Sequence, residues 1–279
     1  RSRSYDSGCS IAEHNGERFK KVWNRLDERQ KLSNRAGSDI MRRAFISDLH
    51  LDQTDEDRFS RFQEFLNVES DRLEEIYILG DLVESWIGDD DDSEFAQRLI
   101  DTISRASKKS ALFIMHGNRD FLIGSSFCSE TGSTLIPDST QLEGGLLLSH
   151  GDCYCIDDHD YQKMKILLRS EDWQREFLSQ SLENRREFGK KIRKESQASN
   201  ATKAERIMDV SKSAIEEVKN RKDIKVVIHG HTHRPGIEKN DDGFTRITLG
   251  PWEHCGWVCY QDESGFQLKC FNLRDRYET

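Results

Sequence analysis

Short apolar runs recur along the chain, and each gives way to polar residues and glycine. The five clearest runs cover residues 44–47, 76–79, 112–115, 146–149 and 226–228. Runs of this length, bounded by turn residues, are typical of buried strands. Apolar residues at helical spacing from Phe59 to Leu66 predict a helix that Thr54 would open as the first residue of a capping box, and Ser93 opens another helix. This alternation of strands and helices predicts a layered α/β fold.

The interval from about residue 157 to residue 223 breaks the alternation. It lacks strand patterns and carries Trp173, Phe177 and Phe188 at helical spacings, which predicts an inserted helical cap. Residues 184–206 hold eight Lys or Arg against three Glu, a local net charge near +5 in a chain of net charge −9. A solvated helix face would explain the charge alone. Beside an apolar face, the charge also fits a substrate with an anionic head and acyl tails at a membrane surface.

Residues 1–40 are polar and hold little apolar periodicity, so we expect a disordered or non-native extension ahead of one domain at residues 41–279. Seven Cys is an odd number, and Cys153 and Cys155 stand close to a candidate ligand, a pattern that favours a reducing cytosol. No apolar stretch approaches the length of a membrane span, and no apolar leader precedes Met41. These features predict a soluble or peripheral protein.

Side chains that commonly bind metal ions follow every one of the five runs. They are Asp48, His50, Asp81, Asn118, His150, His231 and His233. Because an open α/β sheet keeps its ligands at the carboxyl ends of its strands, we expect all seven at one edge of a sheet. Positions 48 and 50 are two residues apart, as are 231 and 233, and in extended backbone that spacing aims both side chains of a pair the same way. With three further ligands, the two pairs suffice for two adjacent divalent ions that activate a water.

Each of these motifs alone has a simpler explanation. Asp-x-His after a strand is a weak signal, Gly-Asn is typical of a turn, and Gly-Asp usually caps a helix. The motif from Gly230 to His233 is a stronger signal of a metal site, because two imidazoles beside a glycine turn are rarely buried only to pack a hydrophobic core. His116 and His229 end apolar runs, where a core or supporting role is expected. The ordered set of five motifs favours a two-metal hydrolase, and its span from 48 to 233 favours one domain with an insertion.

The ordered set resembles the calcineurin-like metallophosphoesterases, whose pattern is Asp-x-His, Gly-Asp, Gly-Asn-His, His and Gly-His-x-His. Arg119 stands where most members carry His. Longer strings resemble one branch, the UDP-2,3-diacylglucosamine diphosphatases of lipid A synthesis. These strings cover residues 80–90, 116–124, 157–162, 207–210 and 229–235. The resemblance, from about Met41 to about Asn272, implies an α/β fold of the metallophosphoesterase type: a β-sandwich flanked by helices (αββα) with an inserted helical cap.

The resemblance also implies a site. The first ion would be held by Asp48, His50, Asp81 and His233, and the second by Asp81, Asn118, His150 and His231, with Asp81 as the bridge. Two divalent ions, most commonly manganese in this family, are implied, although such mixed ligands also suit iron or zinc. The implied catalytic residues are Arg119, Asp81 and Asn118, and the implied substrate contacts are Asn118, Arg119, Asp158, Ser196, Asn200, Lys203 and His231. Pro251 departs from the Asp expected there, a departure that concerns the local backbone and not the ligands.

Arg119 has a chemical rationale of its own. An alkoxide leaving group benefits from a general acid such as His. Cleavage of a diphosphate releases a phosphate ester, which needs little protonation, and a bidentate guanidinium suits the charge on the transferred phosphoryl oxygens. Arg119 therefore favours pyrophosphate over monoester chemistry. The alternative is a surface Arg paired with Asp120.

For function, the resemblance implies cleavage of the pyrophosphate bond of UDP-2,3-diacylglucosamine, giving UMP and 2,3-diacylglucosamine 1-phosphate. It further implies a lipid-linked nucleotide sugar as substrate, a cytoplasmic location with peripheral contact at the inner membrane, a monomer, and no nucleic-acid partner. Two alternatives remain: a phosphodiesterase or nucleotide-sugar pyrophosphatase acting on a soluble substrate, and a non-catalytic metal-binding scaffold. The complete set of seven ligands argues against the scaffold.

Overall fold

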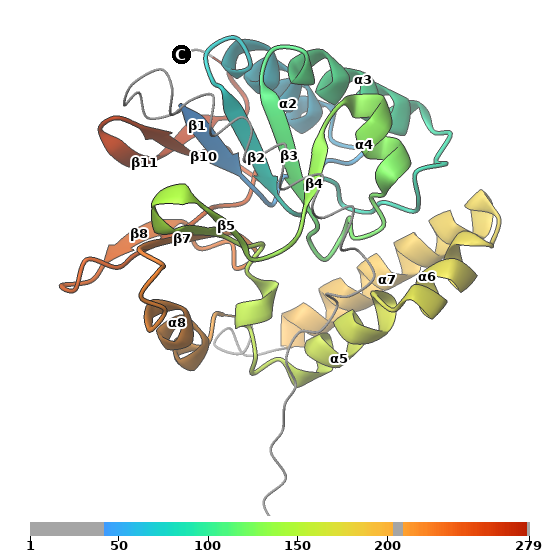
Figure 1. Cartoon of the computed structure of the whole chain (residues 1–279). Helices are drawn as coiled ribbons and strands as arrows, with labels where there is room; N and C mark the ends of the chain where they lie inside the picture. The colour runs from blue at the N-terminus through green and yellow to red at the C-terminus, as the bar shows by residue number, and fades with distance from the viewer. Residues whose placement is uncertain (1–41, 203–208, 278–279) are drawn as a thin grey trace, which may run out of the picture. The chain divides into compact units, whose positions relative to one another are not determined.

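Two β-sheets lie between helices in the structure, a computed structural model that describes residues 42–202 and 209–277 (Figure 1). This arrangement confirms the predicted αββα sandwich with a helical cap. The expectation for residues 1–40 lies outside the described residues. Among the described residues, no helix combines the length and the apolar character needed to cross a bilayer.

The first sheet contains the strands that follow from the three N-terminal apolar runs. Its order is β11 (Gly265–Asn272), β10 (Cys255–Asp262), β1 (Arg43–Ile46), β2 (Glu75–Leu79), β3 (Ala111–Met115) and β4 (Thr134–Ile136). Strands β1 to β4 are parallel, whereas β10 runs antiparallel to β1. The carboxyl ends of β1, β2 and β3 therefore lie at the same edge.

The other two runs belong to the second sheet. Its order is β5 (Thr140–Leu142), β6 (Leu146–Leu148), β7 (Val226–His229), β9 (Thr245–Thr248) and β8 (Gly236–Lys239), and the 3-10 helices Glu143–Gly145 and Asp152–Tyr154 flank β6. Strands β6, β7 and β9 are parallel. The prediction of a single sheet edge for all candidate ligands was therefore wrong: their strands divide three to two between the sheets of a sandwich.

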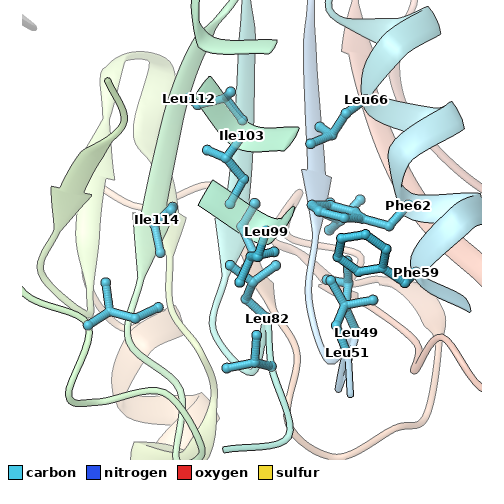
Figure 2. Close-up of a cluster of buried hydrophobic side chains, with 14 of the residues drawn as sticks. Leu49, Leu51, Phe59, Phe62, Leu66, Leu82, Leu99, Ile103, Leu112 and Ile114 are labelled. Atoms are coloured by element: carbon cyan, nitrogen blue, oxygen red, sulfur yellow. The ribbon is translucent and has the colours of Figure 1, made fainter. Parts of the chain in front are cut away.

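Helices α2 (Glu56–Glu69), α3 (Glu94–Ser107) and α4 (Ser125–Thr131) cover the outer face of the first sheet (Figure 1). Phe59 and Leu66 project from α2, and Ile103 projects from α3, into one buried apolar cluster over β1, β2 and β3 (Figure 2). Ser93 caps α3 as predicted, because its hydroxyl accepts from the amide of Ala96 at 3.2 Å.

The predicted cap of α2 at Thr54 was wrong by one residue. The N-cap is Asp55, whose carboxylate accepts from the amide of Arg58 at 3.0 Å. The hydroxyl of Thr54 donates instead to Asp52 at 2.6 Å, so it is engaged in the turn before the helix. A carboxylate at this position also interacts favourably with the positive end of the helix dipole.

Helices α5 (His159–Leu168), α6 (Glu171–Leu178) and α7 (Leu182–Thr202) follow one another beside the sandwich, and we call these three the cap (Figure 1). The rings of Trp173 and Phe177 stack with centroids 4.8 Å apart, and the ring of Phe188 is tilted against both at 5.2–5.8 Å. Phe177 belongs to the apolar cluster of the first sheet, and the other two rings pack against that cluster.

Helix α8 (Lys212–Lys219) lies within the interval expected to form the cap but packs elsewhere. Its side chains Ala214 and Val218 share a buried cluster with Leu147 of β6 and Val227 of β7. It covers the second sheet, because its apolar face meets the apolar residues of those strands. It thus supplies the outer helical layer on that side of the sandwich (Figure 1).

Candidate metal centre

The seven side chains predicted as ligands gather where the carboxyl ends of β1, β2 and β3 meet those of β6 and β7. Two groups among them have ligand atoms that all lie within 4.8 Å of one another: Asp48, His50 and His233, and Asp48, Asp81 and His150. The convergence arises from strands of both sheets, so the site lies across the sandwich edge. All five motifs are therefore brought together.

Three ligand atoms of the first group face a common space. Nε2 of His50 lies 3.3 Å from Nε2 of His233 and 3.6 Å from Oδ2 of Asp81. Nε2 of His233 lies 3.5 Å from Oδ1 of Asp48. Imidazole nitrogens and carboxylate oxygens at these separations form a donor set that suits a divalent transition metal.

A further set of contacts centres on Asn118. Its Oδ1 lies 3.1 Å from Nε2 of His150, 3.0 Å from Nδ1 of His231 and 3.1 Å from Oδ2 of Asp81. Two oxygens this close repel each other unless a cation lies near them or the amide is turned over, so that its nitrogen, a donor of two hydrogens, faces the three atoms. With the oxygen inward, the four residues fit a cation. Oδ2 of Asp81 thus lies near Asn118 and also near Nε2 of His50, so it borders both sets of side chains.

The backbone of the site is in the left-handed region, and the expectation of extended pairs was wrong. Six non-glycine residues of the described chain have positive φ, and five of them are candidate ligands. They are Asp48 (54°), His50 (47°), Asp81 (52°), His231 (68°) and His233 (57°). Side chains rarely adopt this conformation, and such residues cluster at functional sites. The pairs converge because both members leave the strand direction in a tight turn.

Three glycines leave room for this arrangement. A Cβ atom at Gly80 would come within 2.5 Å of Nδ1 of His150, and one at Gly117 would collide with the carboxylate of Asp81. A Cβ atom at Gly230 would collide with the side chain of Asp48. Each glycine precedes a candidate ligand and lets one ligand loop approach another, which is the physical reason for the Gly-x motifs.

Asp120 holds two of the ligand loops together. Its buried carboxylate accepts from the amide of Leu82 at 2.8 Å and from the amide of Gly117 at 2.7 Å. These loops carry Asp81 and Asn118. Burial and the charge of Asp81 raise the pKa of Asp120 to about 6. This carboxylate has a supporting role that sequence reasoning missed.

The loop with the unexpected Pro251 also supports the site. The next residue, Trp252, is fully buried, and its backbone amide donates to the carbonyl of Asp48 at 3.0 Å. Its indole packs edge-on against Phe65 with ring centroids 5.5 Å apart. Proline therefore leaves intact the contact that anchors the turn of Asp48.

Carboxylates dominate the electrostatics of the site. Burial alone would lower the pKa of His150, but the charges of Asp81 and Asp152 outweigh burial and raise it to about 9. Burial and the nearby charge of His150 lower the pKa of His231 to about 4. One imidazole is thus held in a field that attracts positive charge, and the other is held neutral. The field at His150 favours a bound cation in place of its ring proton, and the neutral His231 has a nitrogen lone pair that can bind one.

The other residues predicted for the site lie in different parts of the structure. Arg119 is half-buried beside the site, and its backbone amide donates to Oδ1 of Asp81 at 2.9 Å. Asp158 caps α5, where its carboxylate accepts from the amide of Tyr161 at 3.2 Å. Ser196 and Asn200 lie on α7, but their side chains are outside the described part of the structure, as is the whole of Lys203.

His116 and His229 have the supporting places that were expected. A ring nitrogen of His116 lies 2.7 Å from the carbonyl of Ile123, and one of His229 lies 3.0 Å from the carbonyl of Gly230. Glu84 was not singled out from the sequence. Its Oε2 lies 3.0 Å from Nδ1 of His50, and only its place after Asp81 in the same loop could have indicated this.

Comparisons with known proteins indicate the family of the chain. Residues 41–235 match the family model described as calcineurin-like phosphoesterase. A UDP-2,3-diacylglucosamine hydrolase from Cellvibrio japonicus is 37% identical, covering 84% of this chain and 100% of its own length. One from Haemophilus influenzae is 40% identical, covering 79% and 95%. A solved dimetal phosphatase from Danio rerio has 14% identity and a TM-score of 0.44, covering 86% of this chain and 98% of its own. The chain thus belongs to the calcineurin-like phosphoesterases, in the branch that contains the UDP-2,3-diacylglucosamine hydrolases.

Proposed function

We propose that this protein hydrolyses the pyrophosphate bond of UDP-2,3-diacylglucosamine, releasing UMP and 2,3-diacylglucosamine 1-phosphate. The observation that carries the proposal is the convergence of the candidate ligands around Asp81, whose Oδ2 lies 3.6 Å from Nε2 of His50, 3.9 Å from Nε2 of His150 and 3.1 Å from the side-chain amide of Asn118. The names of relatives at 37% and 40% identity supply the substrate. The same reasoning places the reaction in lipid A synthesis.

The proposed ligand sets divide the seven side chains between two ions that share Asp81. Asp48, His50, Asp81 and His233 would hold one divalent ion, and Asp81, Asn118, His150 and His231 would hold the other, with Asp81 shared. When bound, two such ions, for which we propose manganese, supply Lewis acidity and lower the pKa of a water. The chain's part is to fix the ligand atoms, and the left-handed turns and the glycines accomplish this.

Arg119 is proposed to bind the phosphoryl oxygens of the substrate. Its backbone amide donates to the carboxylate of Asp81, so its side chain leaves the backbone beside the loops that carry the candidate ligands. A guanidinium offers paired donors to phosphoryl oxygens and stays charged at all working pH values. Asn118 borders the same space and is proposed to contact substrate as well. His in the position of Arg119 would favour a general-acid role instead.

The cap is proposed to hold the acyl chains and to contact the membrane. Among the described residues, large apolar side chains with high exposure concentrate on it: Met164 (49%), Ile166 (74%), Leu167 (54%) and Leu178 (41%), with Ile156 (41%) just before it. Asp158, Ser196, Asn200 and Lys203 are proposed as further substrate contacts. Peripheral contact with the cytoplasmic face of the inner membrane and a monomeric state complete the proposal.

The substrate proposal is tested by comparing two substrates on the purified manganese-loaded protein. Acyl chains contribute about 0.8 kcal/mol for each buried methylene, and part of that binding energy orients the reacting phosphate. We expect kcat/KM for UDP-2,3-diacylglucosamine to exceed that for UDP-glucosamine by at least ~1000-fold. Equal values would favour a soluble nucleotide-sugar pyrophosphatase. No turnover of either substrate, or of a generic diester, would favour a metal-binding scaffold.

Membrane contact is tested by sedimentation with vesicles that contain anionic lipid. Burying an exposed aliphatic side chain in lipid stabilises binding by about 1.5–3 kcal/mol. Ile166→Ser should therefore weaken vesicle binding by roughly tenfold or more. The matched control is Ile237→Ser, because Ile237 is also exposed (37%) but lies on β8 of the second sheet. Equal effects of the two substitutions would refute the assignment of the membrane face to the cap.

A further inference from the structure

Glu84 lies at a junction between two ligand loops. Its backbone amide donates to the carbonyl of Leu51 at 2.9 Å, next to an isolated parallel bridge between Leu51 and Val83. Backbone hydrogen bonds thereby join the segment after β1, which carries His50, to the segment after β2, which carries Asp81. The side chain of Glu84 emerges beside the ring of His50.

One oxygen of Glu84 contacts this ring. Oε2 of Glu84 lies 3.0 Å from Nδ1 of His50, while Nε2 of the same ring faces His233 at 3.3 Å. Both partners are largely buried, with side-chain exposures of 12% for Glu84 and 13% for His50. A histidine that binds a metal through one nitrogen commonly presents the other to a carboxylate, which fixes its tautomer and ring orientation.

The other oxygen of Glu84 contacts the cap. Oε1 lies 3.1 Å from Nε of Arg193, on α7, and NH1 of Arg193 lies 3.2 Å from Oδ2 of Asp52. Asp52 follows His50 by two residues on the loop after β1. A single arginine of the cap therefore binds both ligand loops, and the carboxylate of Glu84 is shared between the cap and a candidate ligand.

We propose that Glu84 is a positioning residue that couples the placement of cap helix α7 to the orientation of His50. A shift of α7 would move Arg193, which contacts one oxygen of a carboxylate whose other oxygen lies 3.0 Å from Nδ1 of the imidazole. The same helix carries Ser196 and Asn200, so substrate binding along α7 and metal binding at His50 influence each other. By linkage, each must change the affinity of the other by the same factor. This inference rests on the metal site proposed above.

The first test measures manganese binding rather than activity. Metal-free protein is titrated with Mn²⁺, and unbound Mn²⁺ is followed by its electron paramagnetic resonance signal. Loss of a supporting carboxylate typically weakens metal binding by about 10–100-fold, which is the expectation for Glu84→Ala. Glu84→Gln should lose less, because an amide oxygen can still accept from Nδ1–H of His50. Wild-type affinity in both variants would overturn the positioning role.

The second test compares two arginines of α7. Arg193 and Arg186 both have 39% side-chain exposure, and each pairs with two carboxylates, but Arg186 pairs with Asp91 and Asp92, away from the ligand loops. Arg193→Gln should weaken manganese binding by at least about threefold, and Arg186→Gln should leave it unchanged. Electrostatics alone predicts the opposite sign, because removing a nearby positive charge favours a cation. Unchanged or tighter binding in Arg193→Gln would overturn the coupling.

A double substitution tests whether Arg193 acts through Glu84. If it does, Arg193→Gln should have no further effect in the Glu84→Ala background. Fully additive effects would show separate actions and overturn the relay. Failure of the wild-type protein to bind any Mn²⁺ would refute the proposed metal site itself, whereas wild-type binding with insensitive variants refutes only this inference. Should Glu84→Ala fail to fold, the Glu84→Gln variant carries the same comparison.

Discussion

The attachment of the cap to the sandwich can be tested at one buried arginine. The side chain of Arg185, on α7, is 2% exposed; its NH1 donates to the carbonyl of Ile87 at 2.8 Å and to Oδ1 of Asp90 at 2.7 Å. NH2 donates to Oδ2 of the same carboxylate at 2.5 Å. Asp90→Ala should therefore leave a buried guanidinium with only a carbonyl as acceptor.

The magnitude follows from the number of contacts and their exposure. A hydrogen bond to a charged group contributes about 1.5–3 kcal/mol, and Asp90→Ala removes two. Because the side chain of Asp90 is 62% exposed, solvent screens the pair, and we expect a loss of about 1–3 kcal/mol. For a domain of this size, that corresponds to a fall of about 3–10 °C in Tm. Thermal unfolding of the metal-free protein, followed by circular dichroism, measures the change.

The matched control is Asp92→Ala. Asp92 lies on the same loop, is 72% exposed and pairs with the same helix, but its partner Arg186 is 39% exposed. An exposed ion pair contributes about 0–1 kcal/mol, so Tm should fall by less than about 3 °C. An equal fall in the two variants would refute the argument that burial of the arginine decides the energy.

The contribution of Asp90 should also depend on pH. Its hydrogen bond with Arg185 lowers the pKa of Asp90 in the folded protein. A group with a lowered folded pKa adds stability that is complete above the unfolded value of about 3.9 and is lost as pH falls through the folded pKa. The Tm difference between wild type and Asp90→Ala should thus be full at pH 7 and shrink below about pH 4. A constant difference would contradict this linkage.

Three further predictions concern the metal centre. Asp81→Ala should abolish activity and lose both ions by elemental analysis, because Oδ2 of Asp81 faces both ligand groups; retention of two ions would refute the bridging assignment. Arg119→Ala should lower kcat by at least ~100-fold with metal content unchanged, since the backbone amide that donates to Asp81 is kept in the variant; full activity would exclude its role. Gly117→Ala should lose metal by collision with Asp81, while Gly236→Ala, which has open space, should not; equal metal contents would contradict the steric argument.

The strands and the identities of the candidate ligands could be predicted because both are local properties of the sequence. Each apolar run became a strand with shifts of one residue at its ends, as at β1 and β7. The predictions that were wrong concern features that depend on distant parts of the chain. The division of strands between two sheets follows from pairings such as β1 with β10, which join residues more than two hundred positions apart.

The sequence pattern also could not predict the backbone geometry of the site or the contacts that support it. The spacing of Asp48 and His50 is compatible with extended backbone and with a left-handed turn, and only the approach of neighbouring loops selects the turn. Glu84 and Asp120 look like ordinary loop carboxylates until the loops are placed. Helix α8 resembled a continuation of the cap because its amphipathic pattern does not reveal which apolar surface it will cover.

The left-handed turns at the ligands carry an evolutionary consequence. A non-glycine residue in a sparsely populated conformation costs of order 1 kcal/mol or more, so five such residues together cost an amount comparable with the net stability of a domain. Glycine at any of them would relieve that strain and stabilise the fold. A lineage freed from the need to bind metal would be expected to drift toward glycine at these positions. At these five positions, folding stability is thus exchanged for the placement of ligand atoms.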